Sequence, residues 1–294
     1  MAVIAMEGAV RGALALTPRQ GPGGVRLLAS TTNGHARYAV LFLPEGTADV
    51  LRKALTQRPG WDALRLEGLN QRDADALTTA FARAGHRVET ERRFHSLLRR
   101  SGPDAPPLPA PSSKTRRRRD RQERAFAETG RLEWVDATGP DSVSALDAFI
   151  AGEAQSWKAA TGEPLNASPE IAGFYRTLAQ GSDPTLRVTL LKRDGTVVAG
   201  LICVEANGER VALKTFYDMD LKRHSPGMMV LRRAAQQVDN APDFSRLDLF
   251  SDWSQYDGLA NDQRALCDLT IWNSTPRATL LRLARIGLRR LRGS

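Results

Sequence analysis

The residues best suited to chemistry lie between Lys214 and Met228, in a segment that reads as the end of a strand, a short loop and the start of a helix. Ser225 suits the N-cap position, and Pro226 suits the first helical position because its missing N–H would find no acceptor there. Gly227 would let a ligand approach the backbone closely. Because free N–H groups and the helix dipole converge at a helix N-terminus, the segment fits a phosphate site as well as an ordinary capped helix.

A second candidate for chemistry is Glu153, which opens the sequence Glu-Ala-Gln-Ser-Trp-Lys at residues 153–158. A helix is expected over about residues 141–160, and Glu153 falls within its apolar stripe, three residues after Ile150 and four before Trp157. A buried carboxylate is uncommon unless it is paired or functional. Two roles are therefore open for this side chain, a general base or a structural ion pair. The candidate ionic partners are Lys158, Arg176 and Lys214.

Taken in order, these segments resemble the GNAT acetyltransferase domain of the CelD-like family, which is associated with cellulose and other exopolysaccharide biosynthesis in bacteria. Glu153 with the Ser-Trp-Lys that follows it is similar to that family's helix motif, and residues 174–179 are similar to its next helix. Residues 187–206 resemble its central hairpin. Residues 214–227 resemble its Tyr-Asp to Ser-Pro-Gly segment, which binds the cofactor pyrophosphate in this superfamily. The resemblance covers about residues 110–250.

The resemblance implies a GNAT acyltransferase fold, an α/β (α+β) arrangement in which helices flank a mixed, largely antiparallel sheet. It also implies acetyl-CoA or another acyl-CoA as the donor substrate, without a metal. The cofactor-binding residues would be Phe216, Tyr217, Arg223, Ser225, Gly227 and Met228. The acceptor would be bound by Trp157, Lys158 and Lys214.

Acyl transfer from a thioester to an amine needs a base that takes a proton and a donor that stabilises the departing thiolate. Glu153 and Asp218 are the candidates for the base. Tyr256 lies just beyond the second of two strands that splay apart around the thioester in a GNAT fold, and it is the candidate for the acid. His224 is expected on the protein surface.

The sequence departs from the family pattern after the strand expected at residues 246–250. Similar families often carry a Tyr-Lys pair there, whereas residues 251–258 read Ser-Asp-Trp-Ser-Gln-Tyr-Asp-Gly. The resemblance favours N-acetyl transfer to an amino sugar or another amine acceptor in envelope or exopolysaccharide biosynthesis. Because the lysine is absent, two alternatives stay open: long-chain N-acyl transfer to a lipid amine, and a degenerate, nucleotide-responsive regulator without catalysis.

The length of 294 residues predicts two domains. Residues 1–101 are expected to form a GNAT-like unit that is not catalytic, because they carry no equivalent of Ser-Pro-Gly. A proline-rich linker is expected at residues 102–113, and the acyltransferase unit at residues 114–274. The strand expected at residues 266–272 would complete the sheet of that second unit. A basic amphipathic helix would follow at residues 275–294.

Periodicity and turn residues predict the elements inside these units. In the first unit, strands are expected at residues 37–43 and 64–66, and helices at residues 47–57 and 72–84. In the second unit, the dipeptides Asp194-Gly195 and Asn207-Gly208 predict two-residue hairpin turns between strands.

The chain is basic, with 42 Lys and Arg against 33 Asp and Glu and a formal net charge of +9. The basic run at residues 114–124 lacks the interleaved aromatic residues that stack on bases, so nucleic acid is not expected as a partner. In the helix expected from Thr275, leucines lie on one face, arginines lie on the other, and acidic residues are absent. Such a helix fits docking on the sheet or contact with an anionic membrane surface.

Two cysteines, Cys203 and Cys267, provide neither a disulfide framework nor metal-ligand spacing. No apolar stretch is long enough to span a bilayer, and the first residues do not form a convincing signal peptide. We therefore expect a cytoplasmic protein, peripheral on the inner membrane face if the last helix binds lipid.

Overall fold

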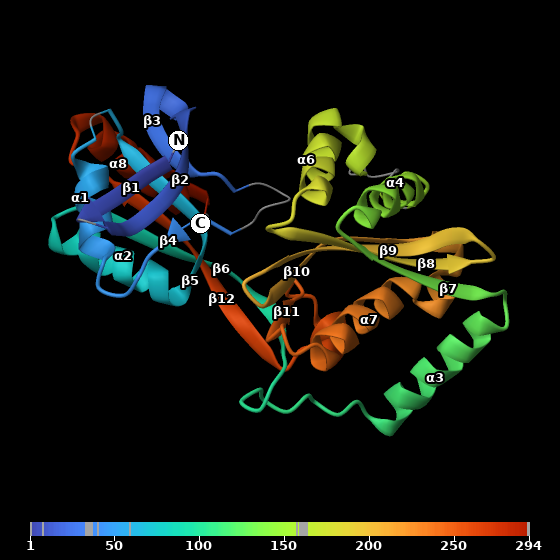
Figure 1. Cartoon of the computed structure of the whole chain (residues 1–294). Coiled ribbons are helices and arrows are strands. Elements are labelled where there is room, and N and C mark those ends of the chain that lie inside the picture. The colour runs from blue at the N-terminus through green and yellow to red at the C-terminus, as the bar shows by residue number, and fades with distance from the viewer. Residues whose placement is uncertain are drawn as a thin grey trace. The chain divides into compact units, whose positions relative to one another are not determined.

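A computed structural model describes residues 2–7, 9–32, 38–39, 41–58, 60–156, 158 and 164–292 (Figure 1). The chain forms two compact units. Unit 1 consists of residues 1–95 and 264–294, and unit 2 consists of residues 96–263. Strand β6 begins in the first unit and ends in the second, so its last residues, from Ser96 onward, belong to unit 2.

Unit 1 is a mixed sheet with helices, in the strand order β1-β2-β3-β5-β12-β6. Strand β3 runs parallel to β5, and the β1–β2, β2–β3 and β5–β12 pairs are antiparallel. Its elements are β1 (Ala2–Glu7), β2 (Ala9–Gly21), β3 (Val25–Ser30), β4 (Leu41–Phe42), α1 (Ala48–Thr56), β5 (Ala63–Asn70), α2 (Gln71–Arg83), β6 (Arg87–Arg100), β12 (Asp262–Trp272) and α8 (Pro276–Arg292).

Unit 2 is also a mixed sheet flanked by helices, in the order β6-β11-β10-β9-β8-β7. Strands β7 to β10 form an antiparallel meander, and β11 runs parallel to β10. Its elements are α3 (Ser113–Ala127), β7 (Leu132–Thr138), α4 (Asp141–Glu153), η2 (Leu165–Ala167), α6 (Pro169–Gln180), β8 (Thr185–Arg193), β9 (Thr196–Ala206), β10 (Glu209–Tyr217), η3 (Met219–His224), α7 (Pro226–Asn240), β11 (Arg246–Asp248) and η4 (Ser254–Leu259).

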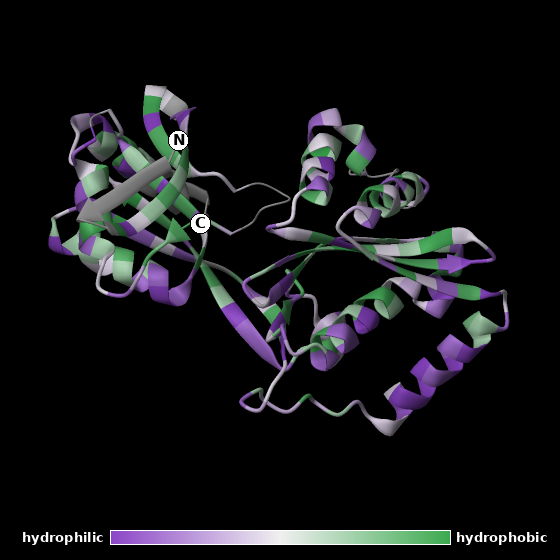
Figure 2. Ribbon diagram, in the orientation of Figure 1, coloured by the Kyte–Doolittle hydropathy of each residue, from purple (hydrophilic) through white to green (hydrophobic). Residues whose placement is uncertain are grey.

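Helices cover both faces of the unit 2 sheet. Figure 1 shows α4 and α6 on one face and α7 on the other. Phe149 of α4 and Tyr175 of α6 are buried with Phe216 of β10 in one core, whereas Val230 of α7 and Leu201 of β9 are buried in the other. Figure 2 shows the resulting contrast, since the buried strand β9 is largely hydrophobic and the basic helix α3 is hydrophilic along most of its length. The predicted α/β architecture is confirmed.

Several helices, strands and turns that the sequence predicted are present in both units. The predicted helices correspond to α1 and α2, and the predicted strand at residues 64–66 lies within β5. At both predicted hairpins the two turn residues have positive φ, with values of 49° and 80° at Asp194 and Gly195 and of 51° and 71° at Asn207 and Gly208. This is the conformation that a type I′ turn requires.

One predicted strand belongs to unit 1 rather than to unit 2. The strand at residues 266–272 was expected to complete unit 2, but it pairs with β5 of unit 1, from Leu266 opposite Asn70 to Trp272 opposite Ala63. In unit 2 the place beside β11 is taken by the end of β6, where Arg100 lies opposite Arg246. The apolar pattern of residues 266–272 predicts a strand but does not specify its partner, which only the tertiary structure decides.

Strands β1, β2 and β3 precede every strand that the sequence predicted. The strand predicted at residues 37–43 is reduced to β4, which pairs with β2, and residues 37 and 40 lie outside the described residues. The predicted non-catalytic role of the first unit stays a prediction.

Close packing of α4 on β10 makes Gly152 a sensitive position. A Cβ atom added there would lie 2.5 Å from Cζ of Phe216, whose ring is buried. We expect Gly152→Ala to lower the free energy of unfolding by about 1–3 kcal/mol because the core is overpacked. In Gly173→Ala, on α6, the added Cβ meets nothing within 4 Å, so this variant should be stabilised by about 0.5–1 kcal/mol. Urea denaturation of both variants measures the difference; equal stabilities would contradict the packing argument.

A buried carboxylate joins β3 to the start of α8 in unit 1. Asp62 accepts hydrogen bonds from Nε and Nη2 of Arg26, at 3.2 and 3.1 Å, and from the Thr275 hydroxyl at 2.9 Å. The hydrogen bond from Arg26 is the main reason why the pKa of Asp62 falls to about 2. The carboxylate therefore contributes stability above its unfolded pKa of about 4, and this contribution is lost as the pH falls toward 2.

Asp62→Asn should accordingly destabilise the protein near pH 7 by about 1–2 kcal/mol, with a smaller difference from wild type at pH 3. Thermal denaturation at both pH values tests this. The control is Asp49→Asn, which removes the carboxylate of a surface ion pair with Arg52. A difference that does not shrink on acidification would contradict the assignment.

Candidate active site

The candidate site lies where two parallel strands of unit 2 separate. Strands β10 and β11 pair over three positions, which end with Val211 opposite Asp248. Beyond Asp248 the chain stays on β6, because the Leu249 N–H donates to the carbonyl of Leu97 and the Leu97 N–H donates to that of Ser251, both at 2.9 Å. Strand β10 continues to Tyr217, paired with β9 along its other edge. The gap that opens between them is the one predicted from the resemblance.

Asp248 fixes the point of separation. Its carboxylate is fully buried and accepts hydrogen bonds from the Ser96 hydroxyl of β6 and, at 2.8 Å, from the Phe250 N–H. Phe250 has a positive φ of 53°, which turns the chain away from β10. A left-handed conformation is unfavourable for a bulky residue, and the hydrogen bond to Asp248 helps to hold it.

A cavity of about 310 Å³ occupies this gap within unit 2. Its walls come from the end of β10, from the first turns of α7 with the residues before it, and from the segment that follows β11. The lining residues are Thr215, Tyr217, Lys222, Ser225, Gly227, Met228, Leu231, Trp253, Gln255 and Tyr256. Five of the predicted site residues are thus together: Tyr217, Ser225, Gly227, Met228 and Tyr256.

The turn before α7 differs from a side-chain cap. Pro226 is the first residue of α7, as predicted, but Ser225 makes no side-chain capping hydrogen bond and adopts a left-handed conformation with φ 55° and ψ 47°. Its carbonyl accepts from the N–H groups of Met228 and Met229 at 3.0 and 3.3 Å. The Ser225 side chain instead lines the cavity.

Gly227 is needed for packing as well as for access. A Cβ atom at this position would lie 2.9 Å from Cδ1 of Tyr217. The first turn of α7 therefore rests on the Tyr217 ring of β10, and only glycine allows that approach. The sequence predicted a close approach at this position but assigned it to a ligand alone.

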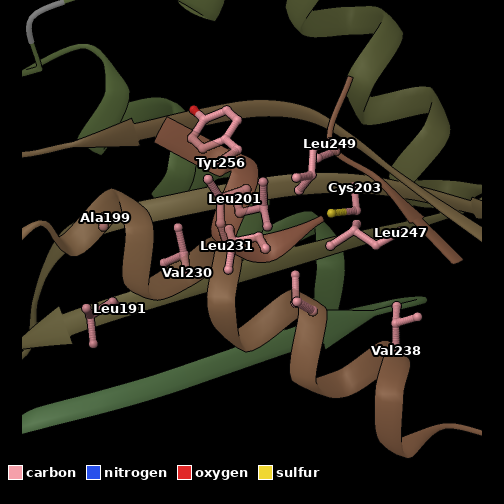
Figure 3. Packing of buried hydrophobic residues seen from close by; sticks show 14 of the residues in the cluster. Leu191, Ala199, Leu201, Cys203, Val230, Leu231, Val238, Leu247, Leu249 and Tyr256 are labelled. Atoms are coloured by element: carbon pink, nitrogen blue, oxygen red, sulfur yellow. The ribbon is translucent and has the colours of Figure 1, made fainter. Parts of the chain in front are cut away.

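Tyr256 has the environment of a hydrogen-bond donor to the cavity. The residue is 8% exposed, and burial raises the pKa of the phenol more than its hydrogen bond with Gln255 lowers it. Figure 3 shows the ring above Leu201 and Leu231, with the hydroxyl pointing away from them. The phenol is therefore neutral at pH 7 and can donate a proton.

Basic residues surround the loops that form the cavity. Lys222 lines it, three positions before Ser225, although no motif in the sequence pointed to this residue. On α3, Gln122 donates to the carbonyl of Arg223 at 2.9 Å, and Nη2 of Arg119 lies 2.7 Å from the position of a Cβ on Gly258. The basic run of α3 is therefore not only a solvated face, because it packs beside η3 and η4.

His224 is buried rather than on the surface. Its ring stacks on Phe126 of α3 with the centroids 5.1 Å apart, and its Nε2 accepts a hydrogen bond from Nε of Arg223 at 2.9 Å. The same contact occupies the Arg223 guanidinium, which does not line the cavity. The prediction missed this burial because Phe126 is about a hundred residues away in the sequence.

Glu153 lies outside the cavity in a buried ion pair. Nζ of Lys158 is 2.6 Å from Oε1 of Glu153, and the Leu165 N–H donates to Oε2 at 2.7 Å. Of the two roles that the sequence left open, the structure favours the structural pair, and it selects Lys158 among the three candidate partners. Trp157 lies outside the described residues.

The other predicted residues also lie away from the cavity lining. Asp218 caps η3 by accepting from the Asp220 N–H at 3.0 Å. Phe216 is buried against Phe149 on the opposite face of the sheet, with ring centroids 4.8 Å apart. Its side chain therefore faces away from this cavity, whereas Thr215 and Tyr217 on either side of it line the cavity. Lys214 is two residues from Phe216 on β10 and is absent from the lining.

Within the described part of the chain, no group of three or more His, Cys, Asp or Glu residues could hold a metal ion. Among the same residues, no helix is long and apolar enough to cross a membrane.

Comparison with protein families supports the same interpretation of unit 2. Residues 113–256 match the sequence profile of the family described as "Acetyltransferase (GNAT) domain". The chain contains a GNAT acetyltransferase domain. The GNAT domain begins with α3 and ends at Tyr256, so it includes the whole cavity lining. The protein is therefore a GNAT-type acyltransferase, whereas membership of the CelD-like family stays a prediction.

Solved structures share the fold at low sequence identity. The chain is similar to a DUF2156 domain assigned to a lysylphosphatidylglycerol synthetase from Agrobacterium fabrum, with a TM-score of 0.59 and 12% identity over 97% of this chain and 88% of that one. It is also similar to L-PGS from Bacillus licheniformis, with a TM-score of 0.54 and 11% identity over 97% of this chain and 88% of that one. A third similar structure is a conserved protein of unknown function from Bacteroides thetaiotaomicron, with a TM-score of 0.56 and 11% identity over 90% of this chain and 83% of that one. A search of curated proteins found no match.

The pair of Glu153 and Lys158 can be tested by removing one charge at a time. Lys158→Met leaves a buried carboxylate without this ammonium group and should lower the free energy of unfolding by about 3–5 kcal/mol. The double variant with Glu153→Gln should recover most of that loss. Arg176→Met, which breaks a half-exposed pair with Asp147, is the control and should cost less than about 1 kcal/mol.

Urea denaturation gives these free energies. If instead Glu153→Gln alone keeps full stability but loses turnover more than about 100-fold, the carboxylate acts as a catalytic base and the structural assignment is wrong.

Proposed function

We propose that the protein is an acyl-CoA-dependent N-acyltransferase whose thioester lies in the cavity between β10 and the segment after β11. The observation that carries this proposal is the buried phenol of Tyr256, which lines a cavity at the point where the two strands of a GNAT domain separate. In this proposal the donor phosphates lie near Lys222 and the start of α7, where a cation and the helix dipole both favour negative charge.

The proposed reaction uses few groups of the protein. The amine nitrogen attacks the thioester carbonyl carbon, the C–N bond forms, and the C–S bond breaks. Tyr256 donates its proton to the departing thiolate and recovers one from water. The described lining contains no carboxylate, so we assign the proton lost by the amine to solvent rather than to Glu153 or Asp218.

The acceptor that we propose is an amine of an envelope component, with an amino sugar of a polysaccharide as the first candidate. The resemblance of the ordered motifs between residues 110 and 250 supports it. A second candidate is a lipid headgroup amine. It is favoured by the structural likeness to a domain assigned to a synthetase whose name refers to a phospholipid.

Donor binding is the first test of the proposal. Thermal shift with acetyl-CoA, a long-chain acyl-CoA and free CoA should show stabilisation, which amounts to about 2.7 kcal/mol at a ligand concentration of 100 Kd. Lys222→Glu should weaken donor affinity at least about 10-fold, since it removes a charge-assisted contact and adds repulsion. Lys53→Glu on α1, far from the lining in sequence and in unit 1, is the matched control. Gly227→Glu is unsuitable because it would collide with Tyr217.

Turnover is the second test. Tyr256→Phe keeps the ring and removes the donor, so kcat should fall about 100-fold while donor affinity stays unchanged. Release of free thiol with amino sugars and with lipid amines as acceptors measures this and separates the two acceptor classes. An unchanged kcat would remove Tyr256 from the mechanism. A protein that binds a nucleotide but no acyl-CoA would be a regulator instead.

A further inference from the structure

The first turns of helix α8 dock on the rest of unit 1 along one side. The Thr275 hydroxyl donates to Asp62 at 2.9 Å and accepts from the Ala278 N–H at 3.2 Å, which caps the start of the helix. Ala278 is fully buried with Ala63 and Trp272, and Leu281 packs against the same small cluster. These contacts fix the direction of the helix.

The apolar stripe of the helix is left open by this docking. Leu280 is 68% exposed and Leu283 is 54% exposed, although they follow directly after the docked turn. Isolated exposed leucines are ordinary, but two that lie three residues apart on one helix form a continuous stripe. Leu288 and Leu291 continue the same stripe at helical spacing in the sequence.

The charge of the same segment is of one sign. Residues 276–294 contain no Asp or Glu, and their six arginines are Arg277, Arg282, Arg285, Arg289, Arg290 and Arg292. A helix that combines exposed leucines with arginines, and has no acidic residue of its own, suits a surface that offers both an apolar phase and negative charge.

We propose that α8 lies on an anionic lipid bilayer, with its leucine stripe in the headgroup region and its arginines at the phosphates. A bilayer that contains anionic lipid supplies both components along the whole helix, which is about 25 Å long at 1.5 Å per residue. Its 17 residues and its arginines suit contact in the plane of the surface rather than a span. This inference concerns unit 1 and does not depend on the chemistry proposed for unit 2.

Co-sedimentation of the full chain with vesicles tests the proposal. Vesicles of phosphatidylcholine with about one third phosphatidylglycerol should bind the protein, pure phosphatidylcholine vesicles should bind it at least about 10-fold more weakly, and 0.5 M salt should release it. The variant Leu280→Ser with Leu283→Ser should lose at least about 10-fold in binding to the anionic vesicles. Both side chains are exposed, so the fold should persist.

A matched control is Phe174→Ser, which removes a half-exposed aromatic side chain from α6 and should leave vesicle binding unchanged. Equal binding of the leucine variant and wild type, or equal binding to neutral and anionic vesicles, would overturn the proposal. A dimer in solution that the leucine variant converts to a monomer would also overturn it, in favour of a second copy as the partner. Thermal shift with acetyl-CoA, measured on the same variant, separates loss of lipid binding from loss of donor binding.

Discussion

The end of parallel pairing between β10 and β11 at Asp248 is the constraint on which the site depends. A buried carboxylate needs hydrogen-bond partners, and Asp248 finds them in Ser96 and in the backbone of Phe250. Once these bonds form, the chain follows β6 and cannot return to β10. The end of β10, which stays paired with β9 but no longer with β11, then presents Tyr217 to the cavity.

Two helices beside this gap are packed closely on β10 by specific contacts. The first turn of α7 rests on Tyr217, which requires Gly227, and the end of α4 rests on Phe216, which requires Gly152. Both aromatic residues belong to β10 and are adjacent in the sequence, so they point to opposite faces of the sheet. Strand β10 therefore positions a helix on each face of the sheet, and its end forms one wall of the cavity.

The distribution of ionisable groups separates stability from chemistry. Glu153 and Lys158 form their pair in the core on the α4 side of the sheet, and His224 is held between Phe126 and Arg223. The cavity itself is lined by neutral side chains, with Lys222 as its charged member among the described lining residues. Such a lining suits the anionic donor and the departing thiolate of the proposed reaction, because the described lining holds no permanent negative charge.

The sequence by itself determined the local features. Turn residues with positive φ, the proline at the start of α7, the helices α1 and α2 and the order of motifs in the GNAT domain were all readable, because each depends on neighbours in the chain. It also brought Tyr217, Ser225, Gly227, Met228 and Tyr256 into one predicted site. Only the tertiary structure decided the partners: that Glu153 pairs with Lys158, that Phe216 faces the core, that His224 is buried, and that β12 joins β5. Each of these depends on which distant side chain or strand edge is nearby, and a periodic pattern carries no information about that choice.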